Sequence, residues 1–155
     1  MSRLDVRPLA GQPDAEWCAR TRSTTEPWIT LKRGYEDSLA LVLDPEREVW
    51  VGWEEATRAG FLILSLKGPF VGYVQTLCVA DGLRGQGLGS ELLAFAEERI
   101  FREFKNVFLC VSSFNPRARA LYERKGYETV GPLRDFVVAG HDEILMRKTR
   151  GPLAS

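Results

Sequence analysis

Stretches of alternating or uninterrupted apolar residues recur along the chain, and each one predicts a β-strand. The seven expected strands cover residues 4–9, 48–53, 60–66, 73–79, 107–111, 127–130 and 141–147. Residues 54–59 form the turn of a hairpin between the second and third strands, which are expected to pair antiparallel. The fifth strand is apolar throughout, as expected of a strand that is covered on both faces of a sheet.

Four segments carry the spacing of apolar residues that is typical of amphipathic helices. They cover residues 14–22, 35–43, 87 to about 104, and 116–125. The order of the elements predicts an α/β fold, in which a mixed, mostly antiparallel central sheet of six to seven strands is flanked by helices. The crossover through the third helix requires the fourth and fifth strands to be parallel.

The segment from Arg84 to Ser90, Arg-Gly-Gln-Gly-Leu-Gly-Ser, joins the fourth strand to the third helix. Its three glycines leave the backbone N–H groups uncovered by side chains. The first N–H groups of a helix have no partner within the helix, and they lie at the positive end of its dipole. A strand, a glycine-rich turn and a helix start therefore predict a site for a ligand that carries phosphates, such as a diphosphate.

Three known patterns could account for this segment. A P-loop needs a lysine where the chain has Gly89, so this pattern is excluded. The dinucleotide fingerprint G-x-G-x-x-G needs a third glycine where the chain has Ser90, and a carboxylate after the next strand, where the chain has two serines. That fingerprint therefore matches poorly. The pattern Q/R-x-x-G-x-G/A is matched by Arg84, Gly87 and Gly89.

A second motif, Asn-Pro-Arg-Ala-Arg-Ala-Leu-Tyr-Glu-Arg-Lys-Gly-Tyr, follows at residues 115–127. Asn115 suits a helix N-cap, Pro116 the first helical position, and Gly126 a left-handed cap at the helix end. This block resembles the N-x-x-A-x-x-L-Y-x-x-x-G-F/Y segment of the GNAT superfamily of N-acetyltransferases, which bind acetyl-coenzyme A. The pattern at Arg84, Gly87 and Gly89 resembles the pyrophosphate loop of the same superfamily. A glycine-rich turn and an ordinary amphipathic helix do not explain why both motifs occur in this order.

The resemblance is densest over residues 73–131, and the order of elements extends it over nearly the whole chain. It implies that the parallel fourth and fifth strands splay apart, and that the pantetheine arm of acetyl-CoA enters the gap like an added strand. The cofactor-binding residues that it implies are Leu77, Cys78, Val79, Arg84, Gly85, Gln86, Gly87, Leu88, Gly89, Ser90, Asn115 and Tyr122.

The resemblance also implies catalytic roles. In this superfamily a backbone N–H of the fourth strand, here near Leu77, polarises the thioester carbonyl, and the position of the general acid is Tyr122. The phenol of tyrosine is protonated at neutral pH. The glutamates that relatives use as the base correspond to Tyr73 and Cys110 in this chain, so no base is assigned. The remaining candidates are Glu26, His141, Asp142 and Glu143. Such charged side chains are mostly solvated at the protein surface.

The acceptor site is implied to lie beside the first two helices and the loop between them. Glu26 and Trp28 could hold a cationic amine there, through a carboxylate and an aromatic ring, and a Pro-Trp lid beside a surface glutamate explains the same residues equally well. Strand alternation places Tyr73 and Gln75 on the same side as Leu77, where they could hold a water molecule.

The predicted function is direct transfer of an acetyl group from acetyl-CoA to a primary amine of a small molecule or peptide. The missing glutamates argue against acetylation of ribosomal N-termini or histones. One alternative is a non-catalytic acyl-CoA-binding sensor or subunit of the same fold. A more remote alternative is an NAD-dependent oxidoreductase.

The composition narrows the setting. Lys+Arg and Asp+Glu both number 21, so bulk charge indicates neither nucleic acid nor an anionic membrane as a partner. No apolar run is long enough to span a bilayer, which predicts a cytoplasmic protein. Three separated cysteines and a single histidine predict no metal site. We expect one domain over residues 1–150 with a tail at 151–155, as a monomer or homodimer.

Overall fold

The computed structural model describes residues 2–154, so Met1 and Ser155, the last residue of the expected tail, lie outside the described part. Within residues 2–154 one seven-stranded sheet organises the molecule, in the order β1-β2-β3-β4-β5-β7-β6. Its strands are β1 (Asp5–Pro8), β2 (Arg47–Glu54), β3 (Thr57–Ser65), β4 (Tyr73–Val79), β5 (Asn106–Ser112), β6 (Glu128–Leu133) and β7 (Glu143–Thr149). Neighbouring strands in this sheet are antiparallel, except that β4 and β5 are parallel. The predicted α/β fold with a mixed, mostly antiparallel sheet is confirmed.

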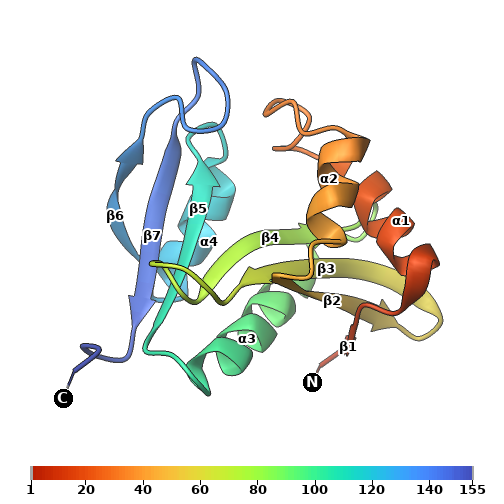
Figure 1. The fold of residues 1–155 in the computed structure, drawn as a ribbon, viewed down its shortest axis with the longest axis horizontal. Helices are drawn as coiled ribbons and strands as arrows, with labels where there is room; N and C mark the ends of the chain where they lie inside the picture. The colour runs from red at the N-terminus through yellow and green to blue at the C-terminus, as the bar shows by residue number, and fades with distance from the viewer. Residues whose placement is uncertain (1, 155) are drawn as a thin grey trace.

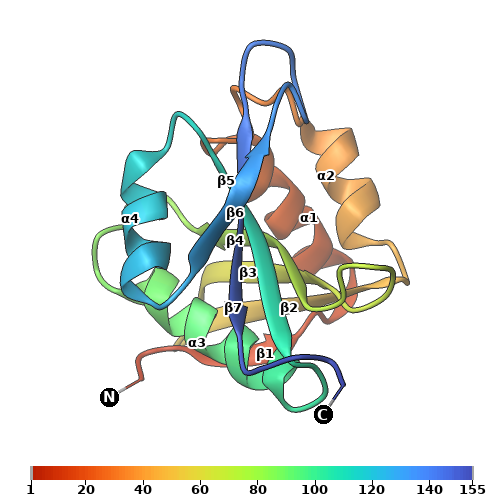
Figure 2. The ribbon, with the colours of Figure 1, turned by 90° about the vertical axis from the view of Figure 1, so that its left-hand side faces the viewer.

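Helices cover both faces of the sheet (Figures 1 and 2). One face carries α1 (Gly11–Ser23) and α2 (Tyr35–Val42), and the other carries α3 (Leu88–Phe101) and α4 (Pro116–Arg124). Figure 1 also shows that β5, β7 and β6 are turned steeply relative to β2, β3 and β4. The sheet therefore consists of two halves that meet where β4 and β5 begin.

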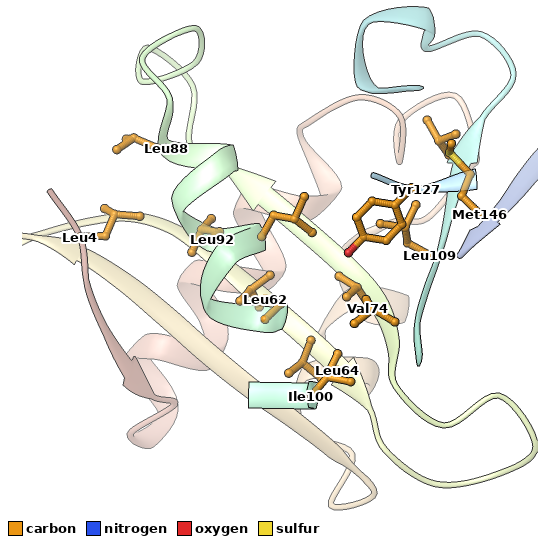
Figure 3. Packing of buried hydrophobic residues seen from close by; sticks show 14 of the residues in the cluster. Leu4, Leu62, Leu64, Val74, Leu88, Leu92, Ile100, Leu109, Tyr127 and Met146 are labelled. Atoms are coloured by element: carbon orange, nitrogen blue, oxygen red, sulfur yellow. The ribbon is translucent and has the colours of Figure 1, made fainter. Parts of the chain in front are cut away.

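Each face of the sheet has its own hydrophobic core. The larger cluster lies under α3 and α4, where Leu62, Leu92 and Ile100 have no exposed surface (Figure 3). The second cluster lies under α1 and α2 and includes Phe61 and Ile63, which are equally buried. Successive residues of β3 thus supply opposite clusters, as strand alternation requires. This explains why β3 reads as a continuous apolar run.

The parallel strands β4 and β5 are paired only where they begin. The pairs between them are Tyr73–Phe108 and Val74–Leu109, whereas β5 pairs with β7 along its whole length. Beyond these two pairs the strands diverge (Figure 1). The predicted splayed parallel pair is therefore confirmed, and we call the space between the diverging strands the β4–β5 gap. A dinucleotide-binding sheet is doubly wound and mostly parallel, so this topology argues against the oxidoreductase alternative.

Several predicted element ends are wrong. The helix α1 begins at Gly11 rather than at residue 14, β6 ends at Leu133 rather than at residue 130, and β7 begins and ends two residues later than predicted. The loop between β2 and β3 holds only Glu55 and Ala56, so the predicted turn over residues 54–59 is too long. Glu55 has a φ of 56°, a left-handed conformation that two-residue hairpins usually fill with glycine or asparagine. A glutamate at that position gives no recognisable turn signal. The helix α3 also ends at Phe101 rather than near residue 104.

Both ends of α4 have the predicted caps. The side chain of Asn115 accepts a hydrogen bond of 3.2 Å from the first helical turn. Gly126 has a φ of 96°, and its N–H donates to the carbonyl of Glu123 (3.1 Å). The N–H of Tyr127 donates to the carbonyl of Tyr122 (3.0 Å), which completes a Schellman motif. These local contacts hold Tyr122 in the last turns of a short helix.

Candidate functional site

Residues 84–90, which we call the glycine loop, turn from β4 into α3. Gly85 and Gly87 have φ values of 76° and 83°, and Gly87 is the N-cap of α3. Within residues 2–154 no hydrogen bond is found for the backbone N–H groups of this loop. A Cβ added at Gly85 or Gly87 would meet no atom within 4 Å, so the loop faces open space. Unpaired N–H groups at the positive end of a helix suit a bound diphosphate.

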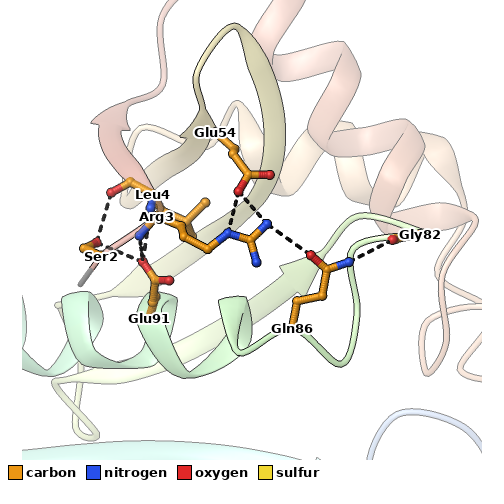
Figure 4. A network of polar contacts seen from close by, with 7 residues as sticks. All are labelled: Ser2, Arg3, Leu4, Glu54, Gly82, Gln86 and Glu91. Atoms are coloured by element: carbon orange, nitrogen blue, oxygen red, sulfur yellow. Dashed lines mark hydrogen bonds and ion pairs between the residues drawn. The ribbon is translucent and has the colours of Figure 1, made fainter.

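Side chains around the glycine loop hold its shape (Figure 4). Arg3 donates to Glu54 (Nε to Oε2, 2.6 Å) and to Gln86 (Nη2 to Oε1, 3.0 Å). Glu91, in the first turn of α3, accepts hydrogen bonds from the N–H groups of Arg3 (2.8 Å) and of the next residue (3.1 Å). The exposed Arg84 pairs with an aspartate three residues earlier (3.0 Å). The protein therefore engages the side chains of the loop and leaves its backbone donors free.

A bulge in β4 turns the Leu77 amide towards the β4–β5 gap. The register between β3 and β4 skips Gln75. The N–H of Ala80 donates to a β3 carbonyl (2.9 Å), and N–H direction alternates along an antiparallel strand. The N–H groups of Leu77 and Val79 therefore point towards β5, with which β4 is not paired beyond Val74. Without the bulge, Leu77 would donate to β3 instead.

The same bulge changes which side chains share a face. Leu77 packs against the cluster under α3 and α4. Tyr73 lies on the opposite face, beside Arg22 of α1 and Cys110 of β5. Gln75 accepts a hydrogen bond of 2.8 Å from an arginine of β2. The prediction that Tyr73 shares a side with Leu77 is wrong, because alternation holds only along an unbroken ladder.

Tyr122 projects from α4 into the cluster under α3 and α4. Its ring meets the ring of Tyr127 edge to face, with 5.9 Å between the centroids. Desolvation by these apolar neighbours raises the pKa of Tyr122 to about 12. No hydrogen bond of its hydroxyl is found in the described part of the chain. The phenol therefore keeps its proton at neutral pH and has a free donor.

A polar cluster formed by Tyr73, Cys110, Ser112 and Glu143 lies on the other face, towards α1 and α2. Ser112 and Glu143 are register partners of β5 and β7, and the Ser112 hydroxyl donates to Glu143 Oε2 at 2.6 Å. Only 7% of Glu143 is exposed. Burial raises the pKa of this carboxyl group, and the bond from Ser112 opposes that rise. The expectation that Glu143 is a solvated surface group is wrong.

The polar cluster and the Leu77 amide lie beside the same gap. Leu77 is three residues beyond the last residue of β4 that pairs with β5, and Ser112 is three residues beyond its partner on β5, so the two residues border the gap from opposite strands. Glu143 adjoins Ser112 on the next strand. A carboxylate of β7, a hydroxyl of β5 and a backbone donor of β4 thus lie on or beside the strands that border the gap.

The two residues that were expected to bind the acceptor amine, Glu26 and Trp28, have other contacts within the protein. Trp28 is 9% exposed and packs in the cluster under α1 and α2, with the guanidinium carbon of Arg22 5.2 Å from its ring centroid. Glu26 is exposed, and its two oxygens accept hydrogen bonds from the N–H (2.9 Å) and hydroxyl (2.8 Å) of Thr30. The carboxylate of Glu26 therefore closes a local turn.

The other base candidates differ from Glu143. The ring of His141 packs against Phe114, with 4.9 Å between centroids. Asp142 accepts a hydrogen bond of 3.3 Å from the N–H of Asp135 and so organises the β6–β7 loop. Of the four candidates, Glu143 is the one that combines burial with a raised pKa.

Residues 2–154 contain no group of three or more His, Cys, Asp or Glu residues placed to hold a metal ion. In the same range no helix has the length and hydropathy needed to cross a bilayer. Cys18, Cys78 and Cys110 are free thiols, and burial raises the pKa of each. A surface hollow of about 440 Å³ lies beside α3 and β7, and another of about 400 Å³ lies beside α2 and β2. Both are away from the β4–β5 gap.

Arg22 was not expected from the sequence. It lies near the end of α1 and is only 6% exposed. Its Nε donates to the hydroxyl of Thr76 (3.1 Å) and its Nη1 to the hydroxyl of Ser38 (3.1 Å). The buried face of α1 contains Ala15, Cys18, Ala19 and Arg22. This i, i+3, i+4, i+7 spacing is a helical face, and an arginine on it is the signal that could have identified the residue.

Two relatives match part of the chain. An acetyltransferase of Agrobacterium fabrum, Atu2258, is 41% identical over 61 residues, which cover 39% of this chain and 44% of the relative. The blasticidin-S acetyltransferase of Streptomyces morookaense is 37% identical over 78 residues, which cover 46% of this chain and 57% of the relative. The chain thus spans about half the length of the relatives it matches.

Solved structures support the fold. An aminoglycoside 6′-N-acetyltransferase in complex with coenzyme A superposes with a TM-score of 0.75, over 97% of this chain and 99% of that one, at 17% identity. The family model described as the acetyltransferase (GNAT) family matches residues 14–127. This match includes most of α1, the glycine loop, the β4–β5 gap and the whole of α4, and it shows that the chain belongs to the acetyltransferase (GNAT) family.

Proposed function

We propose that this chain is an N-acetyltransferase that transfers the acetyl group of acetyl-CoA directly to a primary amine. One observation carries the proposal: the free N–H of Leu77 opens into the same gap that the unpaired N–H groups of the glycine loop flank. Two anion-binding surfaces at the end of a splayed strand pair suit a long ligand with a diphosphate and a reactive thioester. The relatives and the family model support the same activity.

In the proposed mechanism, residues on the two faces of the sheet have different roles. The Leu77 N–H donates to the thioester carbonyl oxygen and stabilises the negative charge that develops there. Glu143, on the face towards α1 and α2, accepts the proton of the amine as that amine attacks. A carboxyl group whose pKa is raised by burial is a better base at neutral pH than a solvated one. The amine therefore approaches from the face of the polar cluster.

Tyr122 acts on the opposite face, where the sulfur leaves. Its pKa of about 12 lies about 3.5 above the reference value for a thiol, which corresponds to roughly 5 kcal/mol against complete proton transfer. Tyr122 therefore donates a hydrogen bond to the leaving thiolate and keeps its proton. This role requires a free hydroxyl beside the gap, and the hydroxyl of Tyr122 has no partner within residues 2–154.

The proposed acceptor is a small-molecule amine. One relative is described as acting on blasticidin S and one structural neighbour on aminoglycosides, both of which are small amine-bearing compounds. The two carboxylates outside the polar cluster that could have bound an amine, Glu26 and Asp142, are occupied by local hydrogen bonds. Selectivity for the acceptor must therefore come from other groups on the α1–α2 face.

The test is an assay of free thiol released from acetyl-CoA in the presence of a panel of primary amines. Glu143→Gln is expected to lower kcat/KM by roughly 100-fold or more while leaving the Kd for acetyl-CoA unchanged, because it removes the base and keeps an acceptor for the Ser112 hydroxyl. Glu98→Gln, on the exposed side of α3, is the matched control and should behave as the parent protein.

Binding of acetyl-CoA without amine-dependent thiol release from any member of the panel would contradict the proposal and favour a non-catalytic acyl-CoA sensor. Full activity of Glu143→Gln would leave the transferase intact and remove Glu143 from the mechanism.

A further inference from the structure

Arg22 is a buried cation whose protein partners are all neutral. Its hydrogen bonds go to the hydroxyls of Thr76 and Ser38, and its guanidinium packs over the ring of Trp28. No ion pair of Arg22 is found within residues 2–154. A buried charge is costly unless an opposite charge or a full set of hydrogen bonds compensates it. Burial lowers the pKa of Arg22 only to about 10, so it remains charged at neutral pH.

The guanidinium group of Arg22 has N–H donors that make no hydrogen bond within the described residues. An arginine carries five N–H donors, and the two hydrogen bonds of Arg22 use one on Nε and one on Nη1. Three donors are left, two of them on Nη2. The fully enclosed side-chain atoms that lack a hydrogen bond in the described chain are Asn106 Oδ1 and Arg119 Nε. Because Nη2 of Arg22 also has no hydrogen bond and is not among these enclosed atoms, it is not sealed off from solvent. Its free edge can therefore receive a planar, doubly accepting group.

Arg22 lies next to the proposed reaction centre. Thr76, which accepts its Nε–H, directly precedes Leu77, and neighbouring Cα atoms are about 3.8 Å apart. The positive charge of Arg22 is also close enough to Tyr73 to oppose the rise that burial causes in the pKa of its hydroxyl. Tyr73 belongs to the same polar cluster as Glu143. The free edge of the guanidinium is therefore on the face from which the amine approaches.

The surrounding charges favour an anion at this place. Arg33, exposed at the end of the α1–α2 loop, adds positive charge to the surroundings of Arg22. Asp37 is the carboxylate that opposes it, but Asp37 Oδ2 accepts a hydrogen bond from the N–H of Gly34 (3.4 Å) at the start of α2. The thiol of Cys78 and the phenol of Tyr73 are both kept neutral by burial.

We propose that Arg22 binds a carboxylate of the acceptor, so that the acceptor is a small amine that also carries an acidic group. The inference rests on the proposed function, because it assigns the substrate class of the same site. Guanidinium and carboxylate groups fit each other through two parallel hydrogen bonds, which would use the free donors and neutralise the buried charge. The amine of such an acceptor faces Glu143 while its carboxylate faces Arg22. A polycationic acceptor would instead meet an uncompensated positive charge.

The experiment compares amino acids, both α- and ω-, with their carboxamides in the thiol-release assay. The parent protein is expected to prefer the carboxylate member of a pair in kcat/KM by roughly 10- to 100-fold, the size of a charge-assisted contact with a buried group. Arg22→Met should reduce that preference to within about threefold, mainly by loss on the carboxylate member. Arg20→Met, on the exposed side of the same helix, is the matched control and should keep the preference. Comparing ratios between variants cancels the different pKa values of the paired amines.

A binding measurement separates this inference from the proposed function. Calorimetric titration of the protein with coenzyme A present should show that N-acetyl amino acids bind and that their carboxamides bind about tenfold more weakly, a difference that Arg22→Met removes. If amines are acetylated with no preference for a carboxylate, or if Arg22→Met lowers both members of each pair equally, the inference is overturned and the transferase stands. If carboxylate binding depends on Arg22 but no amine releases thiol, the carboxylate site at Arg22 is real, but the transferase falls and the acceptor assignment falls with it.

Should Arg22→Met fail to fold, Arg22→Lys keeps the charge and loses the planar fork. A melting temperature near that of the parent protein with a carboxylate preference at least threefold smaller supports the assignment. An unchanged preference in a folded Arg22→Lys protein contradicts the paired hydrogen bonds on which it depends.

Discussion

The left-handed conformation of Gly87 makes the glycine loop directly testable. Gly87 has φ 83° and ψ 3°, and an L-residue in that region costs about 1–2 kcal/mol. A Cβ at this position meets no atom within 4 Å, so Gly87→Ala changes the backbone energy and creates no clash. If the fold holds the loop in place, the melting temperature falls by about 2–8 °C in a domain of this size. If the free loop relaxes instead, acetyl-CoA must restore it, and its Kd rises about 5- to 30-fold.

Gly89→Ala is the matched control. Gly89 lies in the first turn of α3 without a positive φ, and a Cβ there would be 3.8 Å from Val79 Cγ2 and 3.9 Å from Leu77 Cδ2, which are ordinary contacts. This variant should bind acetyl-CoA like the parent protein and melt at the same or a slightly higher temperature. Thermal melting with and without acetyl-CoA and calorimetric titration measure both quantities. A Gly87→Ala protein with parental Kd and melting temperature would refute the reasoning, and so would equal impairment of both variants.

Three further predictions concern single side chains. Tyr122→Phe should lower kcat by roughly 10- to 100-fold with little change in the Kd for acetyl-CoA, because the hydroxyl donates a hydrogen bond to the charged thiolate only as the thiolate leaves. If the variant and the parent protein have the same single-turnover rate and the same Kd, Tyr122 does not have that role. Because burial holds the pKa of Glu143 above its unfolded-state value, the native protein binds the extra proton between the two values, and stability is lost as pH rises through that window. Glu143→Gln should therefore melt at a higher temperature than the parent protein at pH 8 and at an equal one below about pH 4, and a difference independent of pH would contradict this. Glu91→Ala removes the acceptor of hydrogen bonds from Ser2, Arg3 and Leu4 and should lower the melting temperature by about 2–4 °C without changing kcat, whereas a parental melting temperature would show that these exposed bonds contribute nothing.

The parts of this fold that depend on local chemistry could be predicted from the sequence. The two caps of α4 need only Asn115, Pro116 and Gly126, and each acts on backbone within a few residues of itself. The glycine loop is likewise a local feature, because three glycines between a strand and a helix expose the N–H groups of that helix. The crossover between β4 and β5 follows from the order of elements and the rule that such connections are right-handed and parallel.

The arrangement around the gap depended on long-range contacts. The bulge at Gln75 arises from the register against β3, and nothing in the local residues predicts that the N–H of Leu77 will point towards β5. Glu143 reads as a surface carboxylate until β5 brings Ser112 beside it, and Arg22 reads as an ordinary helix-end arginine until Thr76 and Ser38 enclose it. By itself the sequence determined the elements, their order and the glycine loop, since caps and periodicity act within a few residues. Only the tertiary structure decided which amide faces the gap and which carboxylate and guanidinium are buried on the face towards α1 and α2, because burial and charge at one residue are set by residues distant in the chain.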